Sequence, residues 1–143
     1  MAAKRVSPTE ARALVEREGY VYVDVRSVPE FEGGRPEGAY NVPFAHATPT
    51  GMRPNEDFMR VMEATFSKDA KLVVGCLMGG RSARACVALE AAGFTCLVDQ
   101  RAGWGGAKDP FGRVTETGWS AQGLPSAHGP DAERGYAALS RVG

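Results

Sequence analysis

The sequence predicts an α/β fold in which short, mostly parallel strands alternate with helices. Three observations predict it. Short apolar runs that are typical of buried strands recur along the first two thirds of the chain. Runs with helical spacing of apolar residues separate them. The chain has 143 residues, of which 43% are apolar, and this suits one compact domain with one core.

The first helix is expected at residues 7–19, "SPTEARALVEREG". Ser7 has a side chain suited to an N-cap, Pro8 suits the first helical position, and Glu10 completes a capping box. The apolar run "YVYVDV" at residues 20–25 then predicts a strand.

The next stretch is expected to contain little regular structure. Residues 27–32 suggest one short helical turn, because Ser27 and Glu30 have the spacing of a second capping box. Residues 40–42 are expected to be a very short extended piece within a loop. Residues 46–54, "HATPTGMRP", are expected to be irregular.

A second helix–strand–helix–strand series follows. Asn55 is expected to cap the helix that begins there, and "KLVVG" at residues 71–75 predicts a central parallel strand. Ser82 is expected to cap a nearly apolar helix that runs to Ala92, and "FTCLV" at residues 94–98 predicts another strand.

The rest of the chain gives weaker signals. Residues 103–130 are rich in turn residues, and residues 131–141 predict a C-terminal amphipathic helix with Ala132, Tyr136 and Leu139 on one face.

Composition excludes several function classes. The formal net charge is zero, so neither a nucleic-acid nor a membrane partner is expected. The cysteines lack CxxC spacing and the chain has only two histidines, so no metal site is expected. Neither an apolar leader nor a membrane-spanning run is present, and a soluble cytoplasmic protein with reduced thiols is the expectation.

The stretch "GCLMGGRS" at residues 75–82 lies between a predicted strand and a predicted helix. The first N–H groups of a helix have no partner within it, and with the helix dipole they favour an anion. Gly79 and Gly80 let the backbone bend inward without Cβ clashes. The sequence therefore predicts an anion cradle with Cys76 at its start and Arg81 at its end.

This cradle has two possible interpretations. A phosphate loop needs a lysine where Arg81 stands, and a planar guanidinium does not replace a compact ammonium. The alternative places the thiolate of Cys76 in the cradle as a nucleophile. Cys86, in the apolar helix, and Cys96, in a strand, are expected to be ordinary buried residues.

The segments "VDVRSVPEFEGGRPEGAYNVPF" (23–44) and "LVVGCLMGGRSARACVALEAAGFTCLV" (72–98) resemble a single rhodanese domain, a sulfurtransferase. The resemblance covers residues 8–126, so residues 1–143 are expected to be one such domain with a C-terminal extension at 127–143. It implies a three-layer fold with a parallel sheet of about five strands and helices on both faces.

The resemblance also implies the chemistry. Cys76 would take a sulfur atom from thiosulfate or a persulfide and pass it to cyanide or a thiol. A sulfur-accepting protein is a further candidate partner. The resemblance implies no cofactor. Arg81 would bind the anionic donor. The implied substrate-binding residues are Leu77, Met78, Gly79, Gly80, Ser82 and Arg26. Asp24 and Arg26 match a motif interpreted as mainly structural, with Glu30 expected to pair with Arg26.

Two other functions stay open. Related phosphatases and arsenate reductases have a loop one residue longer than the four residues between Cys76 and Arg81. A non-catalytic binding module is disfavoured because Cys76 is present.

The loop carries no basic side chain between Cys76 and Arg81, so thiosulfate is a less suitable donor than a persulfide or a protein. The segment 105–118 resembles an insertion that is expected to border the site.

Overall fold

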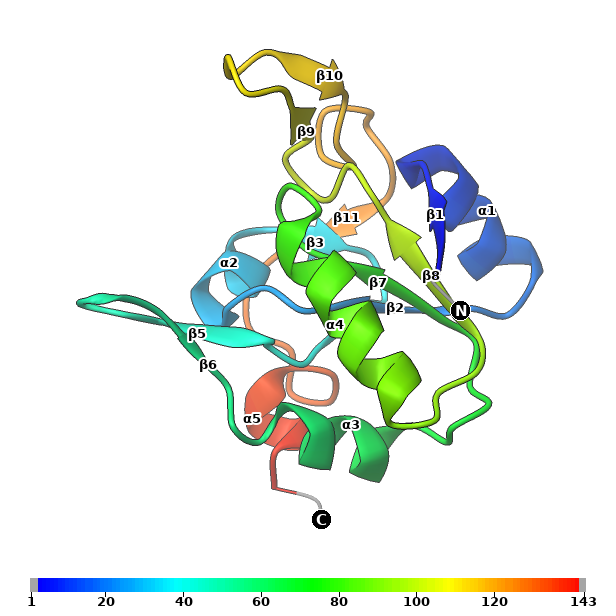
Figure 1. Cartoon of the computed structure of the whole chain (residues 1–143), viewed down its shortest axis with the longest axis vertical. Coiled ribbons are helices and arrows are strands. Elements are labelled where there is room, and N and C mark those ends of the chain that lie inside the picture. Colours follow the sequence, from blue (N-terminus) through cyan, green and yellow to red (C-terminus); the bar gives the residue numbers. More distant parts are fainter. Residues whose placement is uncertain (1–2, 142–143) are drawn as a thin grey trace.

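The computed structural model describes residues 3–141 and shows a central sheet with helices packed against it (Figure 1). Five strands form this sheet in the order β1-β8-β7-β2-β4, and all neighbouring pairs are parallel. Their bounds are Lys4–Val6 (β1), Leu97–Gln100 (β8), Leu72–Gly75 (β7), Val21–Asp24 (β2) and Tyr40–Asn41 (β4). The predicted α/β fold with a five-stranded parallel sheet is confirmed.

The sheet buries a separate cluster of apolar side chains on each face, because successive residues of a strand point to opposite sides. Leu72 packs into a cluster with residues such as Leu89, whereas its neighbour Val73 packs into a second cluster with Ala11. The fold therefore has three layers. The helices are Pro8–Arg17 (α1), Val28–Gly33 (α2), Phe58–Thr65 (α3), Gly80–Ala91 (α4) and Tyr136–Leu139 (α5).

Both predicted capping boxes are present. The Glu10 amide donates to Ser7 Oγ at 3.1 Å, and the Ser7 amide donates to Glu10 Oε1 at 2.9 Å. Ser27 and Glu30 form the same arrangement at the start of α2. Local side-chain chemistry thus determines where α1 and α2 begin.

The prediction that residues 46–54 are irregular is wrong. Ala45–Thr48 (β5) and Gly51–Pro54 (β6) form an antiparallel hairpin that projects from the body of the protein (Figure 1). Gly51 has a φ of +118° at the turn, a conformation that suits glycine. The hairpin lacks apolar alternation because both of its faces are largely solvent-exposed, so it gave no strand signal.

Two element boundaries also differ from the predictions. The strand expected at 94–98 is β8, Leu97–Gln100, and it ends in two polar residues that are fully buried and hydrogen-bonded. Asn55 is not the N-cap of α3; Asp57 is, and Asn55 accepts a hydrogen bond from the Asp57 amide at 3.0 Å one turn earlier. In both places the polar side chains are buried, and hydrogen bonds to other residues satisfy them.

The C-terminal helix is shorter than the predicted 131–141. The carboxylate of Asp131 accepts hydrogen bonds from two following amides, and the chain stays in turns until α5 begins at Tyr136. The segment 105–118 contains a second hairpin, made of Ala107–Lys108 (β9) and Val114–Glu116 (β10). Arg35–Pro36 (β3) and Ser126–Ala127 (β11) form a further antiparallel pair.

Among the described residues, no helix is both long enough and apolar enough to cross a membrane.

Candidate active site

Cys76 lies at the carboxyl end of β7, directly before the loop that leads into α4. This is the strand–loop–helix unit that the sequence predicted. The expectation that Ser82 caps the helix is wrong, since α4 begins at Gly80 with Gly79 as its N-cap. Ser82 instead lies in the first turn of α4, fully buried.

Backbone amides converge on the sulfur of Cys76. The Gly79 amide donates to Sγ at 3.1 Å and the Ser82 amide donates to it at 3.3 Å. Both donors come from the start of α4, where N–H groups have no partner within the helix. The predicted cradle therefore exists around Sγ itself, and it favours negative charge there.

The loop can take this shape because two glycines allow close backbone contacts. Gly79 has a φ of +101°, and a Cβ atom there would clash with the carbonyl oxygen of Arg101. At Gly103 a Cβ atom would lie 2.5 Å from the carbonyl oxygens of both Cys76 and Leu77. The amide of Trp104 in turn donates to the Cys76 carbonyl at 2.8 Å. The segment that follows β8 thus clamps the loop.

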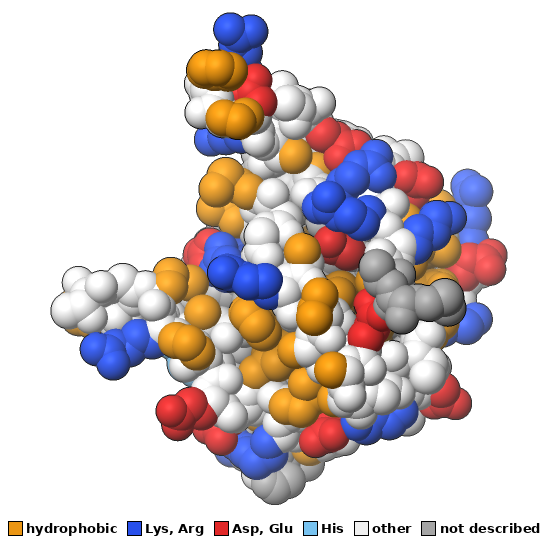
Figure 2. All heavy atoms as spheres, in the orientation of Figure 1, with side chains coloured by type: hydrophobic (Ala, Val, Ile, Leu, Met, Phe, Trp, Pro, Cys, Tyr) orange, Lys and Arg blue, Asp and Glu red, His pale blue; other side chains and the backbone are white. Residues whose placement is uncertain are grey.

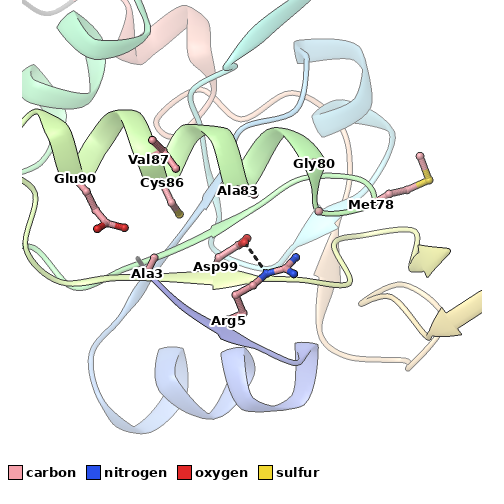
Figure 3. A pocket seen from close by; sticks show the side chains of 10 residues that line it. Ala3, Arg5, Met78, Gly80, Ala83, Cys86, Val87, Glu90 and Asp99 are labelled. Carbon is pink, nitrogen blue, oxygen red and sulfur yellow. Dashed lines mark hydrogen bonds and ion pairs between the residues drawn. The ribbon is translucent and has the colours of Figure 1, made fainter. Parts of the chain in front are cut away.

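A chain of polar groups leads from the sulfur to the surface. Ser82 Oγ lies 3.5 Å from Cys76 Sγ and donates to Asp99 Oδ1 at 2.6 Å. Arg5 Nε donates to Asp99 Oδ2 at 3.2 Å, and Figure 3 shows this pair beside α4. The Asp99 side chain is 3% exposed and that of Arg5 is 55% exposed, so Arg5 covers a buried carboxylate.

Arg81 forms a two-pronged ion pair with Glu30 of α2. Nη1 donates to Oε1 at 2.8 Å and Nη2 donates to Oε2 at 3.0 Å. Burial alone would raise the pKa of Glu30, but hydrogen bonds from Arg81 and Ser27 lower it to about 2. The hydrogen bonds to Glu30 likewise raise the pKa of Arg81. Glu30 is therefore a carboxylate, and Arg81 is charged.

The expected pair between Glu30 and Arg26 is absent, and that prediction is wrong. Arg26 instead binds Asp24, with Nη2 donating to Oδ2 at 2.7 Å, and also donates to the Gly34 carbonyl. Burial raises the pKa of Asp24, while the ion pair with Arg26 opposes this. Arg26 is 2% exposed and its guanidinium is occupied by these partners, which supports the structural role. Its role in substrate binding stays a prediction.

Access to the sulfur is narrow. Cys76 is 2% exposed, whereas Met78, two residues further along the loop, is 51% exposed. A groove of about 440 Å³ runs beside the loop between α4 and the strands β1 and β8 (Figure 3). A second groove, of about 520 Å³, lies between Met78, Arg101 and the β9–β10 hairpin. The 105–118 segment therefore borders the loop.

A third groove, of about 540 Å³, lies between α2, α4 and the β5–β6 hairpin. It is lined by Ser27, Pro29, Glu30, Ala45, Ala47, Met52, Arg81 and Arg84. We call it the hairpin groove. It reaches the cysteine loop at Arg81, so it is a route by which a ligand can approach the site.

Of the other two cysteines, Cys86 is buried as expected, whereas Cys96, expected in a strand, lies just before β8 and is only partly buried. Burial raises the pKa of the Cys86 thiol to about 12, so this thiol stays protonated. Trp119 is 1% exposed and its indole N–H donates to the Pro125 carbonyl at 3.0 Å. Within residues 3–141, no group of three or more His, Cys, Asp or Glu side chains is placed to hold a metal ion.

Sequence reasoning missed two features of the site. The sequence did not single out Asp99 as a site residue, and Glu30 was given the wrong partner. One signal pointed to Asp99, because it directly follows the apolar run "FTCLV" at residues 94–98 that predicts a strand. In the register of the parallel sheet, Asp24 lies opposite Gly75 and Asp99 lies opposite Val74. Groups at the carboxyl ends of neighbouring parallel strands lie close together.

Comparisons with known proteins show similar sequences and a similar fold. The rhodanese-like domain family matches residues 7–106. The senescence-associated protein DIN1 of Raphanus sativus is 39% identical over 107 residues, which cover 72% of this chain but only 58% of that protein. Thiosulfate sulfurtransferase 16, chloroplastic, of Arabidopsis thaliana is 37% identical over 121 residues, covering 85% of this chain and 90% of the relative. The crystal structure of Rv0390 from M. tuberculosis has a TM-score of 0.74 and 27% identity, covering 90% of this chain and 100% of that chain.

Proposed function

Because the chain belongs to the rhodanese-like domain family, we propose that it is a sulfurtransferase that carries sulfane sulfur on Cys76. The observation that carries the proposal is the pair of amides on Sγ, from Gly79 at 3.1 Å and Ser82 at 3.3 Å. Amide donors lower the cost of negative charge at a partly desolvated sulfur. The name of the Arabidopsis relative, thiosulfate sulfurtransferase, supports the same reaction class.

In the first half-reaction, the Cys76 thiolate attacks the sulfane sulfur of the donor. With thiosulfate, a bond forms between Sγ and the sulfane sulfur, and the bond to the sulfonate sulfur breaks. Sulfite leaves with the bonding electron pair. The product is a persulfide with its negative charge on the outer sulfur, where amides of the loop can donate to it.

In the second half-reaction, an acceptor attacks the outer sulfur of the persulfide. Cyanide leaves as thiocyanate, and the electron pair of the broken S–S bond returns to Cys76 as a thiolate. A thiol acceptor loses its proton and leaves as a persulfide by the same balance. Arg81, at the end of the loop, is the proposed anchor of an anionic donor.

One observation favours a second candidate, a rhodanese-like module that binds a partner without catalysis. The Cys76 residue is 2% exposed, so a donor must part the loop before it touches the sulfur. A phosphatase or arsenate reductase is less suitable, because the four residues between Cys76 and Arg81 make a loop one residue shorter than such enzymes have.

Intact mass measurement separates these functions. The protein is incubated with thiosulfate, its mass is measured, and cyanide is then added while thiocyanate is assayed. We expect the mass of one added sulfur atom and its release by cyanide. Cys76→Ala should abolish loading, whereas Cys86→Ala and Cys96→Ala should retain it, and an aryl phosphate should not be hydrolysed. Loading that persists in Cys76→Ala would refute the proposal.

The small anionic sulfur donor and the thiol or cyanide acceptor belong to this proposal, as does a sulfur-accepting protein. The cytoplasmic location expected from the sequence also stays a prediction.

A further inference from the structure

Arginines around the cysteine loop have carboxylate partners. Arg26 pairs with Asp24, at 2.7 Å, and Arg5 pairs with Asp99, at 3.2 Å. The side chain that would meet a donor, Arg81, is held by both oxygens of Glu30. These pairs place positive and negative charge together, so each attracts an anion less than a free arginine would.

The carboxylate of Glu30 is fixed in place before any donor arrives. Its Oε1 accepts a hydrogen bond from Ser27 Oγ at 2.8 Å and another from the Ser27 amide at 3.2 Å. The side chains of Arg81 and Glu30 are only 16% and 27% exposed, so water screens the pair incompletely. The charge of Arg81 is therefore balanced by an anchored neighbour.

Other charged side chains near the site do not supply the missing attraction. The loop between Cys76 and Arg81 has no charged side chain. Arg84 also lines the hairpin groove, but it is exposed, and water and salt screen such a charge. Over the face shown in Figure 2, basic and acidic side chains are interspersed rather than gathered in a single positive field.

The hairpin groove has walls suited to carbon rather than to a sulfonate. Ala45, Ala47 and Met52 of the hairpin and Pro29 of α2 contribute apolar side chains to it. A sulfonate group packed against these apolar side chains would lose hydration and gain no hydrogen bonds from them, which is unfavourable, whereas an alkyl chain would gain buried contact.

We propose that Glu30 is a specificity-determining residue that disfavours the dianion thiosulfate, and that the preferred donor is an organic persulfide, R–S–S–H, with its carbon part in the hairpin groove. This inference rests on the proposed function. The Cys76 thiolate attacks the outer sulfur, the new S–S bond forms, and the old one breaks. The thiolate R–S⁻ leaves with the electron pair, and Cys76 becomes Cys–S–S–H. The charge is minus one before and after the step.

The test compares sulfur loading of Cys76 from thiosulfate and from hydroxyethyl persulfide, followed by intact mass at a series of donor concentrations. Glu30→Gln removes the balancing charge and retains the shape of the side chain. We expect thiosulfate loading to rise about tenfold, through a lower half-saturating concentration, and persulfide loading to change less than about twofold. Glu32→Gln removes the same charge from an exposed site on α2 and should alter neither donor.

A salt titration of the unmodified protein keeps the test decisive if Glu30→Gln does not fold. A balanced Arg81 predicts that thiosulfate loading changes less than about twofold between low and high ionic strength. A fall of more than about fivefold would show that an unbalanced cation attracts the donor, and it would overturn the inference.

The outcomes also separate the inference from the proposed function. If both donors load Cys76 but thiosulfate is preferred, the inference is rejected and the sulfurtransferase proposal stands. The same holds if Glu30→Gln leaves thiosulfate loading unchanged. No loading from either donor rejects the sulfurtransferase proposal, and the inference with it.

Discussion

Two adjacent glycines, Gly79 and Gly80, should respond to the same substitution in opposite ways. Gly79 has a φ of +101°, and a Cβ atom there would clash with the Arg101 carbonyl oxygen. The left-handed conformation costs an L residue roughly 1–2 kcal/mol, and relieving the overlap costs about 1–2 kcal/mol more. Gly79→Ala should therefore lower the free energy of unfolding by about 2–4 kcal/mol, a large part of a typical total of about 5–15 kcal/mol.

Gly80 is the matched control. It is the first residue of α4, and a Cβ atom there would meet nothing within 4 Å. Alanine is the better helix former by up to about 1 kcal/mol, so Gly80→Ala should leave stability unchanged or raise it by about 0.5 kcal/mol.

Urea unfolding followed by tryptophan fluorescence gives both free energies. The loss in Gly79→Ala should be accompanied by slower sulfur loading, because the amide that now lies 3.1 Å from Cys76 Sγ has to move. A Gly79→Ala protein within about 0.5 kcal/mol of the unmodified protein would show that the loop does not need this backbone conformation.

Three further predictions concern charge and burial. The pKa of Glu30 is lowered from 4.5 to about 2, so its pair with Arg81 should stabilise the fold by about 1 kcal/mol above pH 5 and lose this effect as the pH falls toward 2. Urea unfolding of Glu30→Gln and the unmodified protein across this range checks it, and a constant difference would contradict it. Burial raises the pKa of the Cys86 thiol to about 12, so Cys86 in the native protein should react with iodoacetamide at pH 8 at least about 100-fold more slowly than in the unfolded chain. Peptide mass measurement gives both rates, and equal rates would disprove this prediction. Arg26→Lys retains the positive charge but loses the two-pronged hydrogen bonding to buried Asp24, so it should lower the free energy of unfolding by about 3 kcal/mol. Urea unfolding measures this loss, and a loss below about 1 kcal/mol would mean that a lysine can replace the arginine.

The parts of the fold that were predictable from the sequence are those governed by neighbours along the chain. Both capping boxes and the strands β2 and β7 lie where the residue pattern placed them. The errors fall where a distant group completes a hydrogen bond. β8 extends through Asp99 and Gln100, which look unsuitable for a buried strand until their partners Ser82 and Tyr22 are in place.

The sequence by itself determined the strand–loop–helix unit and the position of Cys76 and Arg81 at its two ends, because backbone geometry and glycine placement are local properties. Only the tertiary structure decided which carboxylate faces which arginine. Glu30 is 51 positions from Arg81, and Asp99 is 17 positions from Ser82. These groups meet because the parallel sheet gathers the carboxyl ends of β2, β7 and β8 at one edge, and the order of strands is set by the packing of the whole core rather than by any short stretch of chain.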